Sequence, residues 1–173
     1  MRASLRLFVQ KGIAGTTTRD IAAAAGIAEG TIYRHFESKE AMADEIFLSH
    51  YLPFAGALKR VAGAADDPLE QLRAMVRHFH RSFDADPQVF AFLLLGHHST
   101  IGRIPDGTST PISVLAETIE RLAPKGRDTK LLTHLVLGMI LQPATALLAG
   151  ALTPPLSRHT DAVVEAIHGV LKR

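Results

Sequence analysis

Residues 16–42 read TTTRDIAAAAGIAEGTIYRHFESKEAM, and this stretch decides the fold that we expect for the chain. Thr17 and Asp20 have the three-residue spacing of a capping box, in which two residues at a helix start satisfy each other's backbone N–H groups. Gly26 ends the run of alanines, and glycine is the residue that most often terminates a helix. The stretch therefore predicts a short helix over residues 18–25.

A second short helix, predicted over residues 28–36, follows the glycine directly. Ser38 is a good N-cap, so we expect a long helix from there to about residue 62. The apolar residues of segment 5–13 give an earlier helix a side that can be buried. Two short helices joined through a glycine, in a three-helix packing, match the helix-turn-helix plan, whose second helix enters the major groove of DNA.

Helix signals continue through the rest of the 173-residue chain. Asp67, Asp86 and Thr110 each place a capping side chain before a proline at the first helical position. No run of alternating Val, Ile and Thr residues indicates a strand. We therefore expect an all-α fold of about nine helices, with a mobile surface loop over residues 99–110.

The composition excludes some classes of protein and the charge pattern favours others. The chain has no cysteine, which excludes a disulfide scaffold and a thiolate metal site. Its net charge is only +2, but residues 1–39 carry six Lys and Arg residues against three Asp and Glu residues. The positive excess therefore lies in the first forty residues, as expected of a small anion-binding module on a neutral body.

The quoted stretch resembles the DNA-binding signature of TetR-family repressors. The matching elements are the threonine pair, Ile-Ala, Ala-Gly, Gly-Thr-Ile-Tyr, His-Phe and Ser-Lys-Glu, in consistent order within residues 5–47. The resemblance implies a helix-turn-helix DNA-binding domain at 1–47 and a helical effector-binding and dimerisation domain at 48–173. It implies a transcriptional regulator, typically a repressor, that a small apolar effector releases from a palindromic double-stranded DNA operator.

The resemblance also assigns roles to individual residues of the matched region. At the groove floor, Gly30 permits close approach, and Thr31 can hydrogen-bond a base or contact a thymine methyl group. Glu29 fits there mainly if it accepts from a cytosine amino group. The residues implied at the groove floor are Ala28, Glu29, Gly30 and Thr31, and those implied at the phosphates are Thr18, Tyr33, His35 and Lys39, with Arg34 between two of them.

Two features depart from the family pattern. Ala28 stands where a serine N-cap usually precedes the recognition helix, so a cap contribution of about 1 kcal/mol is lost. Met1 falls almost inside the first helix, where the family has several further residues, often basic. Either the start is displaced downstream, or the first helix and its arm are shortened; both weaken phosphate contact.

In the remaining chain, apolar residues at helical spacing are typical of a helical core. The resemblance adds a ligand cavity walled by these helices, predominantly apolar as small-molecule sites generally are. The candidates for its lining are Phe79, Phe83, Phe90, Leu94, His97 and His98.

The histidines do not form a metal-binding pattern. Residues two apart in a helix lie on nearly opposite faces, and only His80 and Asp84 have a tidy helical spacing. We interpret the histidines as solvated. The sequence also has no glycine-rich phosphate loop and no Gly-x-Ser-x-Gly elbow, so we expect no enzymatic activity and no metal or other cofactor.

A run of 27 residues without a formal charge, 131–157, lies near the end of the chain. Its first 22 residues are long enough to span a bilayer, which makes a membrane-associated or interaction-type helical protein without DNA binding the alternative. Polar residues, two glycines and Pro143 within the run favour a helix buried in an assembly instead. In TetR-like proteins the last two helices pair with those of a second chain. We therefore expect a homodimer through residues of about 128–150 and 157–172, and no membrane.

The start of the sequence has no visible secretory signal. Such a signal has a cationic segment followed by an apolar one, and Arg6 interrupts the apolar residues here. We therefore expect a cytoplasmic location.

Overall fold

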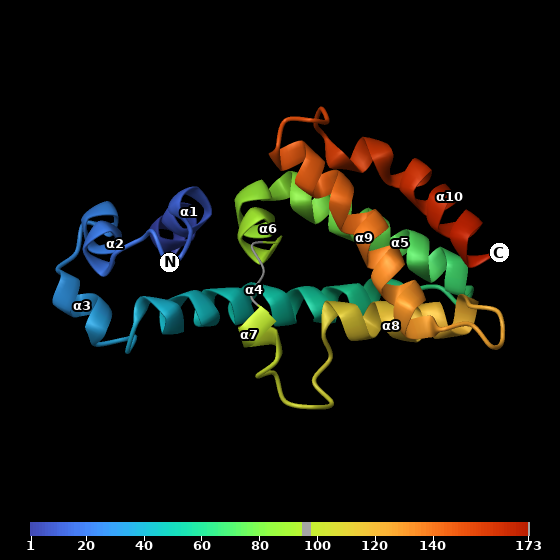
Figure 1. Ribbon diagram of the computed structural model, residues 1–173, viewed down its shortest axis with the longest axis horizontal. Coiled ribbons are helices and arrows are strands. Elements are labelled where there is room, and N and C mark those ends of the chain that lie inside the picture. The colour runs from blue at the N-terminus through green and yellow to red at the C-terminus, as the bar shows by residue number, and fades with distance from the viewer. Residues whose placement is uncertain (95–97, 173) are drawn as a thin grey trace. The chain divides into compact units, whose positions relative to one another are not determined.

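The computed structural model describes residues 1–94 and 98–172, and within these ranges it contains ten α-helices, one 3-10 helix and no strand (Figure 1). The predicted all-α fold class is confirmed. The helices are α1 (Arg2–Lys11), α2 (Thr18–Ala25), α3 (Glu29–Tyr33), α4 (Lys39–Ala62), α5 (Pro68–Ala85), α6 (Pro87–Leu94), α7 (His98–Ile101), α8 (Pro111–Leu122), α9 (Thr129–Leu148), η1 (Leu156–His159) and α10 (Thr160–Leu171).

The chain divides into two compact units. Unit 1 consists of residues 1–51 and 88–106, and unit 2 consists of residues 52–87 and the chain from residue 107 onward. Both units share α4, and the domain boundary predicted at residue 47 falls inside this helix. The grouping of residues 88–106 with the amino-terminal region was not expected, because it depends on contacts between segments far apart in the sequence.

Unit 1 is built around aromatic and aliphatic side chains that exclude water almost completely. Phe8 of α1 and Phe92 of α6 are both 0% exposed, and their rings stack with centroids 5.9 Å apart. Ile21 of α2 and Phe47 of α4 are also buried. Burial of such side chains contributes about 1.5 to 3 kcal/mol each, which is what holds the short helices of this unit in place.

The segment predicted as a mobile surface loop, residues 99–110, is partly ordered. It begins within the short helix α7, and two of its residues bond to one carboxylate of α4. Thr100 and Arg103 both donate hydrogen bonds to Asp44. The expectation of a loop throughout was therefore wrong for its first residues, because the partner on α4 is 56 positions away from Thr100 and leaves no local signal.

Unit 2 is a helical bundle in which α5 occupies the central position. Helix α5 contacts α8, α9, η1 and α10. Figure 1 shows α8, α9 and α10 beside it. Leu72 and Val76 of α5, Ile119 of α8 and Ile167 of α10 are each 0% exposed. The predicted starts of α5 and α8 are confirmed, because Asp67 accepts from the backbone of Glu70 and Thr110 forms a capping box.

Two side chains of α5 bind η1 and the first residue of α10. The Asp84 carboxylate accepts hydrogen bonds from the backbone N–H groups of Leu156, at 2.6 Å, and Ser157, at 2.9 Å. One turn earlier, Nδ1 of His80 lies 2.8 Å from Oγ1 of Thr160. His80 is 0% exposed, and desolvation lowers its pKa to about 4. The interpretation of the histidines as solvated was therefore wrong for His80, which is a buried contact between helices.

Helix α9 holds most of the uncharged run. By length and composition it could cross a membrane, and 28% of its most apolar window is buried within the structure. Leu131, Leu135 and Leu148 are between 45% and 56% exposed, so several large aliphatic side chains of α9 face solvent in the single chain. A shallow apolar groove lies along α9 and continues over the following turn and α10; its lining residues are Leu135, Gly138, Met139, Gln142, Pro143, Ala146, Ala151, Leu152, His159, Ala162, Val163 and Ala166.

Candidate DNA-binding site

The helix-turn-helix expected from the sequence is present in unit 1. Helix α2 begins with the predicted capping box: Thr17 Oγ1 accepts from Asp20 N, and the Asp20 carboxylate accepts from Thr17 N. These hydrogen bonds lower the pKa of Asp20. The helix ends at Gly26, whose φ of 67° lies in the left-handed region that favours glycine.

Helix α3 is shorter than expected. The prediction covered residues 28–36, whereas the helix spans Glu29–Tyr33, and the chain then turns toward α4. Ala28 stands at the N-cap position, and its side chain makes no cap hydrogen bond because a methyl group has no acceptor atom. Ser38 Oγ accepts a hydrogen bond from the backbone N–H of Ala41, so Ser38 caps α4 as predicted.

Three of the predicted DNA-contacting residues form one hydrogen-bonded network across α2 and α3. Oγ1 of Thr18 lies 2.5 Å from a carboxylate oxygen of Glu29 and 3.0 Å from the hydroxyl oxygen of Tyr33. A threonine hydroxyl has a single hydrogen to donate, and an ionised carboxylate can only accept. Thr18 therefore donates to Glu29, and Tyr33 donates to Thr18.

The other predicted contact residues of α3 and the following turn are accessible. Ala28, Gly30, Arg34 and His35 are exposed and Thr31 is half-buried. A Cβ atom added at Gly30 would meet no atom within 4 Å, and this glycine does not have a positive φ. Neither the packing nor the backbone of this chain therefore requires glycine at position 30.

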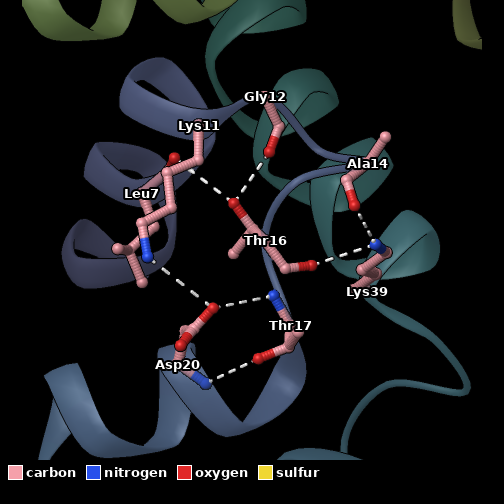
Figure 2. A network of polar contacts seen from close by, with 8 residues as sticks. All are labelled: Leu7, Lys11, Gly12, Ala14, Thr16, Thr17, Asp20 and Lys39. Carbon is pink, nitrogen blue, oxygen red and sulfur yellow. Dashed lines mark hydrogen bonds and ion pairs between the residues drawn. The ribbon is translucent and has the colours of Figure 1, made fainter.

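Lys39 has a different environment from the one predicted for a phosphate contact. Its Nζ atom donates hydrogen bonds to the backbone carbonyls of Ala14, at 3.1 Å, and Thr16, at 2.9 Å, as Figure 2 shows. A carboxylate oxygen of Glu40 lies 3.8 Å from the same nitrogen, and the Lys39 side chain is only 23% exposed. The structure thus gives Lys39 an internal role, while its contact with DNA stays a prediction.

Thr16 is a structural residue of this region that no sequence motif singles out on its own. It is 0% exposed, and its hydroxyl group donates to the carbonyl of Gly12 at 2.7 Å (Figure 2). Its own carbonyl is one of the two that Lys39 binds. The available signal was the pair Thr16 and Thr17 at the start of the quoted stretch. Thr16 closes the turn before α2, and Thr17 caps α2.

The predicted ligand-lining residues are not brought together within one unit. Phe79 and Phe83 are buried in unit 2, whereas Phe90 is buried and Leu94 half-buried in unit 1. His97 lies outside the described residues, as does the side chain of His98. The effector pocket therefore stays a prediction. In the described part of the chain, no group of three or more His, Cys, Asp or Glu side chains could hold a metal ion.

Residues 1–46 match the family model of bacterial regulatory proteins of the tetR family. The amino-terminal region of the chain is thus similar to that of TetR-family regulators. The transcriptional repressor KstR2 of Rhodococcus jostii is 38% identical over 85 residues, which are 49% of this chain and 42% of KstR2. The transcriptional regulator AcrR of Shigella flexneri is 40% identical over 76 residues, which are 43% of this chain and 35% of AcrR. The chain thus spans about two fifths of the length of these TetR-family relatives.

Solved structures show the same fold over nearly the whole chain. The fatty acid degradation regulator FadR of Bacillus halodurans has a TM-score of 0.84 at 21% identity, covering 99% of this chain and 94% of that one. FadR of Bacillus subtilis, solved in complex with stearoyl-CoA, has a TM-score of 0.82 at 18% identity, covering 96% and 94%. The TetR-family helix-turn-helix is thus followed by a helical body that is similar to those of these regulators.

Proposed function

We propose that this chain is a cytoplasmic DNA-binding transcriptional regulator, a repressor that a small apolar effector releases from a palindromic operator. Residues 1–47 are its DNA-binding domain, and residues 48–173 bind the effector and form the dimer. The predicted phosphate contacts are Thr18, Tyr33, His35 and Lys39, with Arg34 beside them, and the predicted base contacts are Ala28, Glu29, Gly30 and Thr31.

The observation that carries this proposal is the exposed surface of α3. Gly30 lies there without any packing or backbone requirement for glycine, so a close approach by another molecule explains it best. Tyr33 is 55% exposed beside it and presents a hydroxyl group at the surface. This surface belongs to residues 1–39, which together carry the positive charge excess, and such an excess suits the phosphates of DNA.

The dimer is proposed through α9 and α10. The groove along these helices is almost entirely apolar, and exposed leucines of α9 continue it. A second copy of the chain presents the same uncharged face, which is the self-complementary arrangement that a two-fold interface needs. The resulting pair would place two recognition helices one DNA turn apart, about 34 Å, to read a palindrome.

The effector is proposed to be a small apolar molecule. Stearoyl-CoA is the first compound to test, because its acyl chain is apolar although its CoA moiety carries anionic phosphates. FadR of Bacillus subtilis, which has a similar fold, is bound to stearoyl-CoA in its structure. An effector releases DNA only if it binds the DNA-free conformation more tightly than the DNA-bound one. Addition of stearoyl-CoA to a preformed protein–DNA complex is expected to lower the affinity for DNA.

The test of DNA binding uses fluorescent duplexes tiled over the DNA upstream of this chain's own coding sequence. Anisotropy is measured at about 50 mM and about 200 mM salt, and we expect one duplex to bind with an affinity that falls steeply as salt rises. A version of the chain extended upstream is measured in parallel. The proposal fails if neither version binds any of these duplexes at the lower salt concentration.

A pair of arginine variants supplies the matched control. Arg34→Ala removes a cation from the proposed interface, and Arg60→Ala removes an exposed cation from the unit 2 end of α4. We expect only Arg34→Ala to weaken DNA binding. Equal effects of the two substitutions would mean that total charge, and not the α3 surface, determines the affinity.

A further inference from the structure

The network of Thr18, Glu29 and Tyr33 commits both of its hydroxyl hydrogens inside the protein. Tyr33 donates to Thr18 across 3.0 Å, and Thr18 donates to Glu29 across 2.5 Å. In the proposed function, which this inference takes as its basis, both of these hydroxyl groups bind DNA phosphates. In the free protein neither has a hydrogen left for a phosphate oxygen.

The carboxylate at the end of this network has no cationic partner. Within residues 1–94 and 98–172, no Lys, Arg or His nitrogen lies within 4.0 Å of a Glu29 carboxylate oxygen. Glu29 is exposed, and its hydrogen-bond donor is the hydroxyl group of Thr18. A phosphate that approached Thr18 would therefore meet an uncompensated negative charge at the same hydroxyl group, and like charges repel.

Binding to DNA thus requires the Glu29 carboxylate to leave Thr18 and to find another donor. The major groove offers two amino groups, N4 of cytosine and N6 of adenine. In adenine the amino group lies beside the N7 acceptor of the same base, which repels a carboxylate, whereas cytosine has no acceptor of its own on the major-groove edge. Cytosine is therefore the base that best replaces the Thr18 hydroxyl group as a partner.

We propose that Glu29 is a specificity-determining residue, whose carboxylate exchanges the Thr18 hydroxyl group for the amino group of a cytosine in the operator. At a site with cytosine in this position, the exchange frees Thr18 and Tyr33 to donate to phosphates. At other sites the carboxylate either keeps the two hydroxyl groups occupied or loses its donor. Glu29 therefore weakens binding to DNA of arbitrary sequence and leaves binding to the operator intact.

The experiment compares the full chain with its Glu29→Gln variant in selection from a library of random duplexes. Glutamine has the shape of glutamate but pairs with N6 and N7 of adenine. The wild type is expected to select cytosine at one position in each half-site, and the variant to select adenine there. Exchanging that base pair is expected to change the affinity of each protein by roughly tenfold to a hundredfold, in opposite directions.

A second measurement records the affinity of both proteins for an unselected random duplex. Glu29→Gln is expected to bind it several-fold more tightly than the wild type does. Glu45→Gln removes the same charge from an exposed residue of α4, and we expect it to change neither the selected sequence nor the random-duplex affinity to this extent. Helical circular dichroism of each variant confirms that the fold is retained.

The outcomes separate this inference from the proposed function. If the wild type, Glu29→Gln and Glu45→Gln all bind duplexes and select the same base at every position, the role of Glu29 is overturned. The DNA-binding function then still stands. An unselected-duplex affinity that rises equally in Glu29→Gln and Glu45→Gln overturns it as well. Failure of the wild type to select any sequence overturns the proposed function and this inference together.

Discussion

The Nζ atom of Lys39 donates a hydrogen bond to the carbonyl oxygen of Thr16, 23 residues earlier in the chain, at 2.9 Å. A second hydrogen bond from the same nitrogen, to Ala14, makes Lys39 the link between the first residue of α4 and the turn that precedes α2. Lys39→Met removes both hydrogen bonds while keeping the apolar stem. We expect the free energy of unfolding to fall by about 1 to 3 kcal/mol, measured by urea denaturation.

Lys59→Met is the control for this variant, because Lys59 is an exposed lysine in the last turn of the same helix. It is expected to change the unfolding free energy by no more than about 0.5 kcal/mol. If Lys39→Met leaves stability unchanged, and instead lowers DNA affinity together with its salt dependence, Lys39 serves as a phosphate contact and its internal hydrogen bonds are dispensable.

Helix α2 could be predicted closely because its start and end signals are local. Thr17 and Asp20 are three residues apart and satisfy each other, and Gly26 adopts the left-handed conformation at the end of the same helix. Lys39 illustrates the opposite case. A lysine next to Ser38 has the same appearance in the sequence whether it binds a phosphate or a carbonyl, and only the folded turn brings Thr16 within reach.

Asp84 provides a second prediction, on unit 2. Its two carboxylate oxygens accept from the backbone of Leu156 and Ser157, and Leu156 is 0% exposed. Asp84→Asn keeps the size but places an amide NH₂ group against one of these donors, so we expect a loss of about 1 to 3 kcal/mol in unfolding free energy. The control is Asp66→Asn, at an exposed residue before α5, which should leave the unfolding free energy unchanged. Urea denaturation of both variants measures the difference.

His80 predicts a dependence of stability on pH. Burial lowers its pKa from 6.5 to about 4 in the folded chain, so between these values the unfolded chain binds a proton that the folded chain does not. The free energy of unfolding should therefore decrease as the pH falls from about 6.5 to about 4, by up to about 3 kcal/mol. Urea denaturation across this range measures the slope.

The His80→Gln variant tests that assignment. Glutamine does not titrate, so the variant should lose most of the slope between pH 6.5 and pH 4, whereas His35→Gln, at an exposed histidine of unit 1, should retain it. The pKa of Asp84 is lowered from 3.8, which places its own contribution at more acidic pH and outside this window. An unchanged slope in His80→Gln would show that other groups carry the acid sensitivity.

The proposed dimer yields a prediction for α9. Leu135 is 48% exposed and lines the apolar groove, so Leu135→Glu would bury a charge in the interface and is expected to give a monomer in sedimentation at micromolar concentration. Ile27→Glu changes a side chain of similar exposure, 45%, in unit 1 and should leave the dimer intact. A wild type that sediments as a monomer at this concentration contradicts the proposed interface.

The sequence proposed residues for the candidate site but not their arrangement, and their contact with DNA stays a prediction. The family spacing singled out Thr18, Glu29 and Tyr33, and the structure joins these three into one network. Their mutual hydrogen bonds depend on the angle between α2 and α3, which no spacing in the sequence specifies. Phe79 and Phe90 show the same limit, because a shared apolar character did not reveal that they belong to different units.

The exposed apolar face of α9 has a thermodynamic consequence. In the proposed dimer, this face is covered only when two chains meet, so the stability of each chain follows mass action and increases with protein concentration. A dilute sample would then unfold at a lower temperature than a concentrated one. At low concentration, the concentration of dimer would rise with about the square of the total chain concentration. Operator occupancy would therefore increase more steeply with chain concentration than it would for a protein that binds DNA as a monomer.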